Sequence, residues 1–210
     1  MAGHDNTAGW DAITAEFERI YPGQTDPKHY GTLISWQLGG NDPLDGISIY
    51  DGGDFWHFVT YGLSELYDKE TEDAEWSGYG YEMTFKLEKA SIAGADEEKE
   101  LRCICGILQA IARITFQNGE IFQNNEYLYT GQTTGIDCGQ KSNITGFICV
   151  YDPSVRTLQT PNGKVEFIEL IGMTDAELQM LKARKGREAV AEIYQRLGTD
   201  VTSYRRASLV

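Results

Sequence analysis

Three stretches of the chain repeat apolar residues every three or four positions, which is the period of a helix with one buried face. They cover residues 8–20, about 96–117 and 186–197. Breaking signals follow the first two, Pro22-Gly23 after one and Asn118-Gly119 after the other. A further helix is predicted after Thr174, because Thr-Asp-Ala-Glu is a capping box in which Glu177 can return a hydrogen bond to the Thr174 backbone.

Between these helices the apolar residues follow the period of two that is typical of strands. The predicted strands are 30–38, a strand from Gly46, 54–63, 78–88, a weak strand at 126–129, 145–153 and 163–172. Segment 54–63 is apolar on both faces, as expected of a central strand that is covered on both sides. Segment 78–88 alternates, so we expect one buried and one solvated face. The expected buried face carries Tyr79, Tyr81, Met83, Phe85 and Leu87.

The order of these elements predicts an α+β fold rather than alternating βαβ units. A chain of 210 residues, 41% of them hydrophobic, has the size and apolarity of one domain. Neither an internal repeat nor a low-complexity linker divides it. We therefore predict a single compact domain over residues 1–210, with a mixed, mostly antiparallel central sheet flanked by helices.

The net charge narrows the range of partners. With 32 acidic and 18 basic side chains the chain carries a charge of −14, which repels nucleic acids and anionic membranes. No apolar run approaches the roughly 18–20 residues that span a bilayer, and the first residues lack the basic and apolar regions of a signal peptide. We therefore expect a cytoplasmic protein without a nucleic-acid or membrane partner.

The acidic residues concentrate in one segment. Residues 65–75 hold six acidic side chains against the single Lys69, whereas residues 182–206 hold seven basic side chains and three acidic ones. A solvated loop explains such a segment, and so does a surface that meets a basic partner. Charge alone leaves both interpretations open.

The segment LGGNDPLDGISIY, residues 38–50, has the glycines and aspartates of several kinds of site. A phosphate-binding loop leads from a strand into a helix, whereas this segment leads into another strand and carries two anionic side chains. A calcium loop needs acids at alternate positions and a distal Glu, which are absent here. We predict a turn in which glycine supplies positive φ and Pro43 fixes φ.

No catalytic or metal-binding pattern emerges. Cys103 and Cys105 lie two apart in a predicted helix, so their side chains point about 200° apart and cannot share a zinc ion. Cys138 and Cys149 are isolated in the sequence, which favours reduced, mostly buried thiols. His57 is the one plausible general base, but aromatic residues surround it and favour a structural role. We predict a protein that is not an enzyme, with no catalytic residue, metal or cofactor.

Five motifs, in order, resemble the Suppressor of fused domain. They are LGGNDPLDGISIY, WHFVTYGLSELY, SGYGYEMTFKL, LQTPNGKVEFIELIGMTDAELQ and VTSYRRASL. The resemblance covers about residues 21–209. The chain looks like a short, stand-alone version of the family's N-terminal domain, which implies a bacterial member.

The resemblance implies a protein-binding function. In animal members it implies that a short peptide of a Gli-type transcription factor is held as an added strand. In bacterial members it implies immunity proteins that neutralise secreted toxins, many of them nucleases. An immunity protein against a basic toxin domain gives the charge of −14 a purpose. An adaptor or regulator that sequesters a peptide segment by strand addition is the alternative.

The resemblance also implies contact residues. Tyr67 matches a tyrosine of the Gly-Leu-Ser-x-Leu-Tyr motif that contributes to peptide binding in the animal proteins. An acid just before Ser-Gly-Phe-Gly falls on Ala74 here, so this sequence departs from the pattern at that contact. We predict that the partner surface consists of Tyr67 and the acids that follow it. The predicted residues are Tyr67, Asp68, Glu70, Glu72, Asp73 and Glu75.

Overall fold

The computed structural model describes residues 6–34 and 36–210, and within them eight strands form one mixed sheet. The strand order is β1-β2-β3-β4-β8-β6-β5, with β7 paired to β8 outside that path. The strands are β1 (Lys28–Gly31), β2 (Gly46–Asp51), β3 (Phe55–Tyr61), β4 (Trp76–Glu88), β5 (Glu126–Leu128), β6 (Ile144–Tyr151), β7 (Leu158–Thr160) and β8 (Gly163–Thr174). Strands β4 and β8 are parallel and the other pairs are antiparallel. The predicted α+β fold is confirmed.

The helices lie close to their predicted limits. They are α1 (Ala8–Ile20), α2 (Glu97–Asn118), α3 (Asp175–Arg184) and α4 (Arg187–Leu197), with short 3-10 helices η1 (Trp36–Leu38) and η2 (Lys89–Ile92). The capping box at Thr174 and Glu177 is formed in full. Helix α2 ends at Gly119, whose φ of 69° is the left-handed conformation that glycine adopts readily. None of the helices in the described part of the chain has the length and apolarity to cross a membrane.

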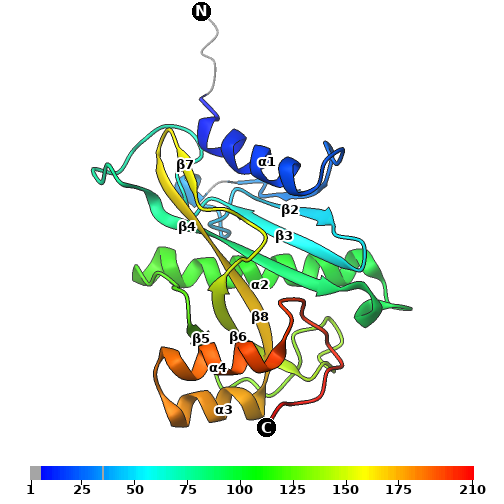
Figure 1. The fold of residues 1–210 in the computed structure, drawn as a ribbon. Coiled ribbons are helices and arrows are strands. Elements are labelled where there is room, and N and C mark those ends of the chain that lie inside the picture. Colours follow the sequence, from blue (N-terminus) through cyan, green and yellow to red (C-terminus); the bar gives the residue numbers. More distant parts are fainter. Residues whose placement is uncertain (1–5, 35) are drawn as a thin grey trace, which may run out of the picture.

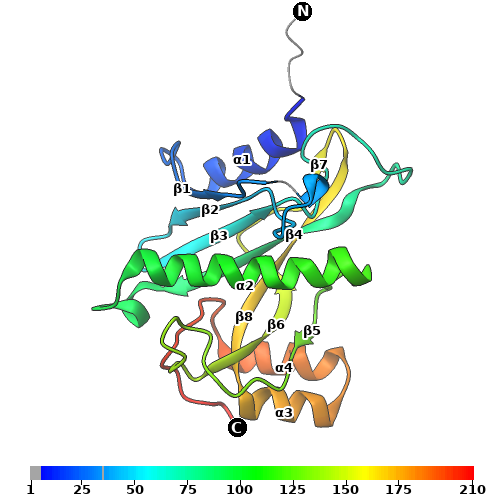
Figure 2. The same ribbon diagram turned by 180° about the vertical axis from the view of Figure 1, so that it is seen from behind.

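Helices cover the sheet on both faces. Figures 1 and 2 show α2 across one face, with α1 and the α3–α4 pair on the other face at opposite ends of the sheet. Leu101 and Leu108 of α2 pack in one apolar cluster with Phe58 and Phe85 of the sheet. Separate clusters lie under α1 and under α3–α4. The two helix groups on the second face therefore leave a gap between them, over the middle strands.

A buried polar layer fills this gap, so the solvated face predicted for β4 is wrong. Glu82, Thr84 and Lys86 lie on that face, and each is at most 1% exposed. Alternation along a strand predicts two faces, but it does not reveal that loops cover the polar one. The chain after β6 brings Asp152 against Lys86, and the chain after α4 brings Asp200 there.

Lys86 is the centre of this layer. Its ammonium group lies 3.0 Å from Asp152, 3.2 Å from Glu169 and 2.7 Å from Asp200. Burial opposes its charge, but these carboxylates outweigh burial and raise the pKa of Lys86. Asp152 also contacts His57, with 2.9 Å between His57 Nε2 and Asp152 Oδ2. One buried cation thus joins β4, β8 and two connecting segments.

The strand predicted over residues 30–38 ends at Gly31 in the structure, because its partner strand β2 does not extend beyond Gly46. β1 pairs with β2 only as far as Gly31, which lies opposite Gly46, the first residue of β2. Beyond it the chain turns away into η1, and Ser35 lies outside the described residues. Leu33 and Leu38 are left 104% and 81% exposed.

The C-terminal segment crosses the end of the sheet and accounts for the motif VTSYRRASL. The Thr202 backbone N–H donates to the Lys86 carbonyl, and the Thr202 carbonyl accepts from the Glu88 N–H. Arg206 forms an ion pair of 2.6 Å with buried Glu177 of α3. The segment therefore fastens the α3–α4 layer to β4.

Candidate functional site

Four of the five motifs that carry the family resemblance contribute residues around Tyr67. A hollow of about 510 Å³ lies there, between an acidic rim and an aromatic wall. The rim carries Asp45, Asp68 and Glu70 beside Tyr67, and the wall carries Trp36, Tyr79 and Phe116. We call this the acidic hollow. Three of the six predicted contact residues, Tyr67, Asp68 and Glu70, line it.

Glu82 of β4 holds the chain that leads into Tyr67. Its Oε1 accepts backbone N–H donors from Gly62, Leu63 and Ser64 at 2.9–3.1 Å and the Ser64 hydroxyl at 2.7 Å. Its Oε2 accepts the Thr60 hydroxyl at 2.6 Å. Burial raises the pKa of Glu82 to about 7, although these donors oppose the change. The Gly-Leu-Ser motif and the Glu of SGYGYE therefore form one structural unit.

The backbone on either side of Tyr67 is fixed from two other elements. The first residues of α1 approach closely, and the Gly9 and Trp10 N–H groups both donate to the Leu66 carbonyl. Asn162, in the turn between β7 and β8, donates its side-chain amide to the carbonyls of Glu65 and Tyr67 at 2.9 and 2.8 Å. The Pro-Asn-Gly motif thus positions the site from a distance of 95 residues in sequence.

Asp45 fixes the other end of the Tyr67 side chain. The two side chains are hydrogen-bonded, and burial raises the pKa of Asp45 while this bond opposes the shift. Tyr67 stays 47% exposed, so its ring is held and still presented to solvent. Asp45 was not among the predicted site residues, because the turn LGGNDPLDG explains it locally. Its neighbour Asp42 is part of that turn and pairs with Arg113 at 2.8 Å.

The acidic segment is ordered by two of its own members. Glu65 accepts the backbone N–H groups of Glu70 and Thr71 and pairs with Lys69 at 2.9 Å. Asp73 accepts the N–H groups of Glu75 and Trp76. Glu65 has a side chain only 9% exposed, so this acid is structural.

The remaining predicted acids divide between two places. Glu72 and Glu75 are exposed but line neither the acidic hollow nor any other described hollow. Asp73 lines a second hollow, of about 660 Å³, on the other side of Tyr79. Of the six predicted residues, three line the acidic hollow, one lines the second hollow and two line neither.

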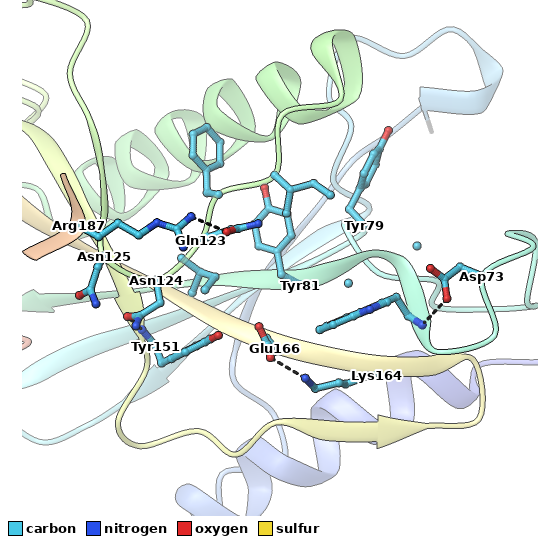
Figure 3. Close-up of a pocket in the computed structure, with 16 residues that line it drawn as sticks. Asp73, Tyr79, Tyr81, Gln123, Asn124, Asn125, Tyr151, Lys164, Glu166 and Arg187 are labelled. Carbon is cyan, nitrogen blue, oxygen red and sulfur yellow. Dashed lines mark hydrogen bonds and ion pairs between the residues drawn. The ribbon is translucent and has the colours of Figure 1, made fainter. Parts of the chain in front are cut away.

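Figure 3 shows this second hollow, which we call the amide hollow. Consecutive amide side chains, Gln123, Asn124 and Asn125, lie on one side of it, and Lys164 and Glu166 of β8 lie on the other. Lys164 pairs with Glu166 at 2.8 Å and lies 4.3 Å from the centre of the Trp76 ring. Arg187 pairs with Glu126 at 2.7 Å. The cations of the amide hollow are therefore already neutralised.

His57 has the contacts of a structural residue. It is fully buried, with Nε2 toward Asp152 and Nδ1 2.7 Å from the Tyr21 hydroxyl. Burial lowers the pKa of His57, so the neutral ring donates to Asp152 and accepts from Tyr21. A substrate cannot reach either nitrogen in this arrangement.

The cysteines are all free thiols. The Cys103 thiol donates to the Ile136 carbonyl at 3.5 Å and the Cys138 thiol to the Lys99 carbonyl at 3.2 Å. Burial raises the pKa of Cys103 to about 12. Among the described residues, no three His, Cys, Asp or Glu side chains converge as a metal ion would require.

The sheet, its helices and these hollows define an α+β domain with two surface hollows beside β4. The model of the Suppressor of fused protein family matches residues 40–207. The chain belongs to this family.

Its relatives include the human Suppressor of fused homolog, which is 29% identical over 192 residues. That match takes in 85% of this chain and 38% of the human protein, so the chain spans well under half of the human relative. A chain in the crystal structure of the Sufu–Fu complex is 28% identical, with a TM-score of 0.81 over 97% of this chain and 93% of that one. Drosophila Suppressor of Fused is 30% identical, with a TM-score of 0.80 over 97% of this chain and 51% of that one.

Proposed function

We propose that this chain is a non-enzymatic protein-binding domain whose partner docks on Tyr67 and the acidic hollow. The arrangement around Tyr67 carries the proposal. Its backbone is held by Asn162 and its side chain by Asp45, yet nearly half of its surface faces solvent. A fixed, partly exposed aromatic ring loses little entropy on binding, and such residues dominate interface energetics.

The charge of the surface supports a basic partner. Glu70, Glu72 and Glu75 are exposed beside Tyr67, and the one lysine of the segment is committed to Glu65. An acidic rim of this kind accelerates encounter with a basic surface. A relative has been crystallised as a Sufu–Fu complex, which supports a protein as the partner class.

The specific function that we propose is immunity, meaning neutralisation of a basic toxin domain such as a nuclease. The charge of −14 favours it, because an acidic surface can block a basic substrate cleft. As part of this proposal we expect the protein in the cytoplasm, which cell fractionation would test. The second candidate is an adaptor that sequesters a peptide, favoured by the hollows beside β4.

The first test is binding kinetics against the product of the neighbouring gene. Replacing Tyr67 by Ala should speed dissociation by roughly tenfold or more, corresponding to about 1.4 kcal/mol. Tyr67→Phe is the matched control, since it keeps the ring and removes only the hydroxyl that bonds Asp45. If the partner binds tightly and Tyr67→Ala dissociates from it at the wild-type rate, the interface lies elsewhere.

The second test separates charge from contact. Neutralising Glu70, Glu72, Asp73 and Glu75 together should slow association and flatten its salt dependence, because exposed charges act mainly on encounter. The control neutralises four other exposed acids and changes the net charge equally. These are Glu18, Asp26, Asp54 and Glu188. If the two sets of substitutions change the association rate equally, the acidic segment acts only through the net charge of the protein.

The two candidate functions differ in one outcome. An immunity protein should abolish the toxicity of the neighbouring gene product when both are expressed in one cell, and Tyr67→Ala should restore the toxicity. An adaptor should bind its partner and leave growth unchanged.

A further inference from the structure

Two half-buried thiols lie at the contact between α2 and the loop that joins β5 to β6. The loop returns beside the first two turns of α2 (Figure 2), where three hydrogen bonds join the two segments. Cys103 of α2 donates its thiol to the loop, at Ile136, and Cys138 of the loop donates its thiol to α2, at Lys99. The Cys138 N–H also donates to Glu100 Oε2 at 3.1 Å. Each thiol therefore points toward the segment that carries the other.

The two thiols are also close enough to affect ionisation. After burial, the Cys138 thiol is the largest cause that raises the pKa of Cys103. Cys105 and Cys149 differ, because both are buried and no second thiol contributes to their raised pKa values among the described residues. Of the four free cysteines, only Cys103 and Cys138 are thus both partly accessible and close to a second thiol.

A hollow of about 310 Å³ opens beside the pair and is lined by Glu100, Asp137 and Tyr204. Tyr204 is 5% exposed, and its hydroxyl makes no hydrogen bond within the described part of the chain. Burial raises the pKa of Tyr204, and Glu100 and both thiols add to the rise, so the hydroxyl stays protonated in their neighbourhood. The surroundings of the pair therefore offer space and an unused donor.

We propose that Cys103 and Cys138 form a redox modification site, which hydrogen peroxide converts into an intramolecular disulfide. The Cys138 thiolate attacks one peroxide oxygen, the O–O bond breaks, and a sulfenic acid forms as the other oxygen leaves as water. The Cys103 sulfur then attacks the sulfenic sulfur, so the S–S bond forms, the S–O bond breaks and a second water leaves. The two thiols lose two electrons and two protons, and the peroxide accepts them.

The order of the two steps follows from access and charge. Cys138 reacts first, because its hydrogen bond to Lys99 lies at the surface, whereas the bond from Cys103 to Ile136 is partly buried. Besides burial and Cys138, the nearby acids also raise the pKa of Cys103, which therefore remains a thiol at neutral pH. Since a thiolate is the better nucleophile, closure of the bond should be slow near neutral pH and faster as the pH rises.

The disulfide fastens a long loop to α2. Residues 119–143 contain only the short strand β5 as regular structure, and residues 121–125 of this loop line the amide hollow. A bond between residues 103 and 138 closes most of this stretch into a ring, which removes conformational freedom from the unfolded chain. We therefore expect oxidation to stabilise the fold. This inference goes beyond the proposed function, because it does not depend on a partner at Tyr67.

The test uses the full chain, which is reduced, freed of reductant and exposed to hydrogen peroxide at about pH 8. Trypsin cuts after Arg113, so Cys103 and Cys105 lie in one peptide and Cys138 lies in the next. Mass spectrometry without reductant should find these peptides joined, with a mass lower by two hydrogen atoms than their sum. The oxidised protein should melt roughly 5 °C or more above the reduced protein, and reductant should reverse both changes.

Cys105→Ala is the matched control, because its thiol lies in the same tryptic peptide as Cys103 but is buried. It should form the crosslink as wild type does. Cys103→Ala and Cys138→Ser should each abolish the crosslink and the rise in melting temperature. Circular dichroism of each reduced variant shows that it is folded, and the loop variant Cys138→Ser serves as the test if the helix variant does not fold.

Three outcomes would overturn the inference. The first is a crosslink that persists in Cys138→Ser or disappears in Cys105→Ala. The second is thiols that gain oxygen atoms without forming a bond within one chain, since the two sulfurs then lie too far apart to react. The third is a crosslinked protein that melts no higher than the reduced one, because the bond then strains the contact between α2 and the loop.

Discussion

At the scale of single residues, a few buried or half-buried polar side chains decide the shape of the candidate site. Glu82 is the clearest case, because one buried carboxyl receives five donors and fixes the chain before Tyr67. Four of the five reach Oε1, and the Thr60 hydroxyl reaches Oε2. A proton on Oε2 can be accommodated by rotating that hydroxyl, so the protonated form keeps the four bonds to Oε1.

A pH dependence follows from the raised pKa of Glu82. Since its pKa rises from 4.5 in the unfolded chain to about 7 in the fold, its stabilising effect is present below pH 4.5 and is lost as the pH rises through 7. Glu82→Gln keeps an Oε1 acceptor and does not titrate. Denaturant unfolding from pH 4.5 to 8 should show wild type losing up to roughly 3 kcal/mol relative to Glu82→Gln.

Glu82→Leu is the contrasting variant. It leaves three backbone N–H groups without an acceptor, two of them buried, and each buried one costs about 1–3 kcal/mol, so the variant should be severely destabilised at every pH. A difference between wild type and Glu82→Gln that stays constant from pH 4.5 to 8 would contradict titration of Glu82.

At the scale of elements, the docking of α1 beside Tyr67 depends on a close backbone approach. A Cβ on Gly9 would lie 2.2 Å from the Glu65 carbonyl oxygen, far inside any normal contact. Alanine is the better helix former, so intrinsic preference and packing oppose each other at this position. We expect the steric clash to outweigh the gain in helix propensity, because the clash is with main chain that Asn162 holds in place.

Gly9→Ala should therefore destabilise the protein, even though it replaces glycine by alanine within a helix. Gly106→Ala is the matched control, because a Cβ there meets nothing within 4 Å. It should stabilise the protein by up to about 1 kcal/mol through helix propensity alone. Thermal unfolding of the two variants should move in opposite directions, and a gain for Gly9→Ala would mean that α1 does not dock on residues 65–66.

At the scale of the whole molecule, the buried polar layer joins parts that share no apolar cluster. Lys86 connects β8, the chain after β6 and the chain after α4, between the clusters under α1 and under α3–α4. Removing the cation leaves Asp152, Asp200 and Glu169 facing one another, and Asp152 and Glu169 are fully buried. Such a loss is costly, whereas replacement of the entire layer by apolar residues need not be.

Lys86→Met should lower the free energy of unfolding by about 3–5 kcal/mol. Lys89→Met, three residues further on, should cost no more than about 1 kcal/mol, because its pair with Asp51 is half exposed. Chemical denaturation measures both. A mild effect of Lys86→Met would show that the acids around it become protonated at little cost.

The sequence by itself determined the helices, most strands and the acidic segment. These features are local: the period of apolar residues, the capping box at Thr174 and the Asn-Gly that ends α2 all act within a few residues. The sequence also contained the motifs of the family and Tyr67 within them. It therefore fixed the fold class and the family, because both depend on patterns that are continuous along the chain.

Only the tertiary structure decided which of those residues act together. The length of β1 depended on where β2 begins, and the face of β4 depended on loops from 66 and 114 residues away. Asp45, Asn162 and Glu82 reach Tyr67 or its backbone neighbours from separate turns and strands, and residues 123–125 line the second hollow from beyond α2. Periodicity reports which face of an element is apolar, but contacts between distant polar side chains follow from how the layers stack.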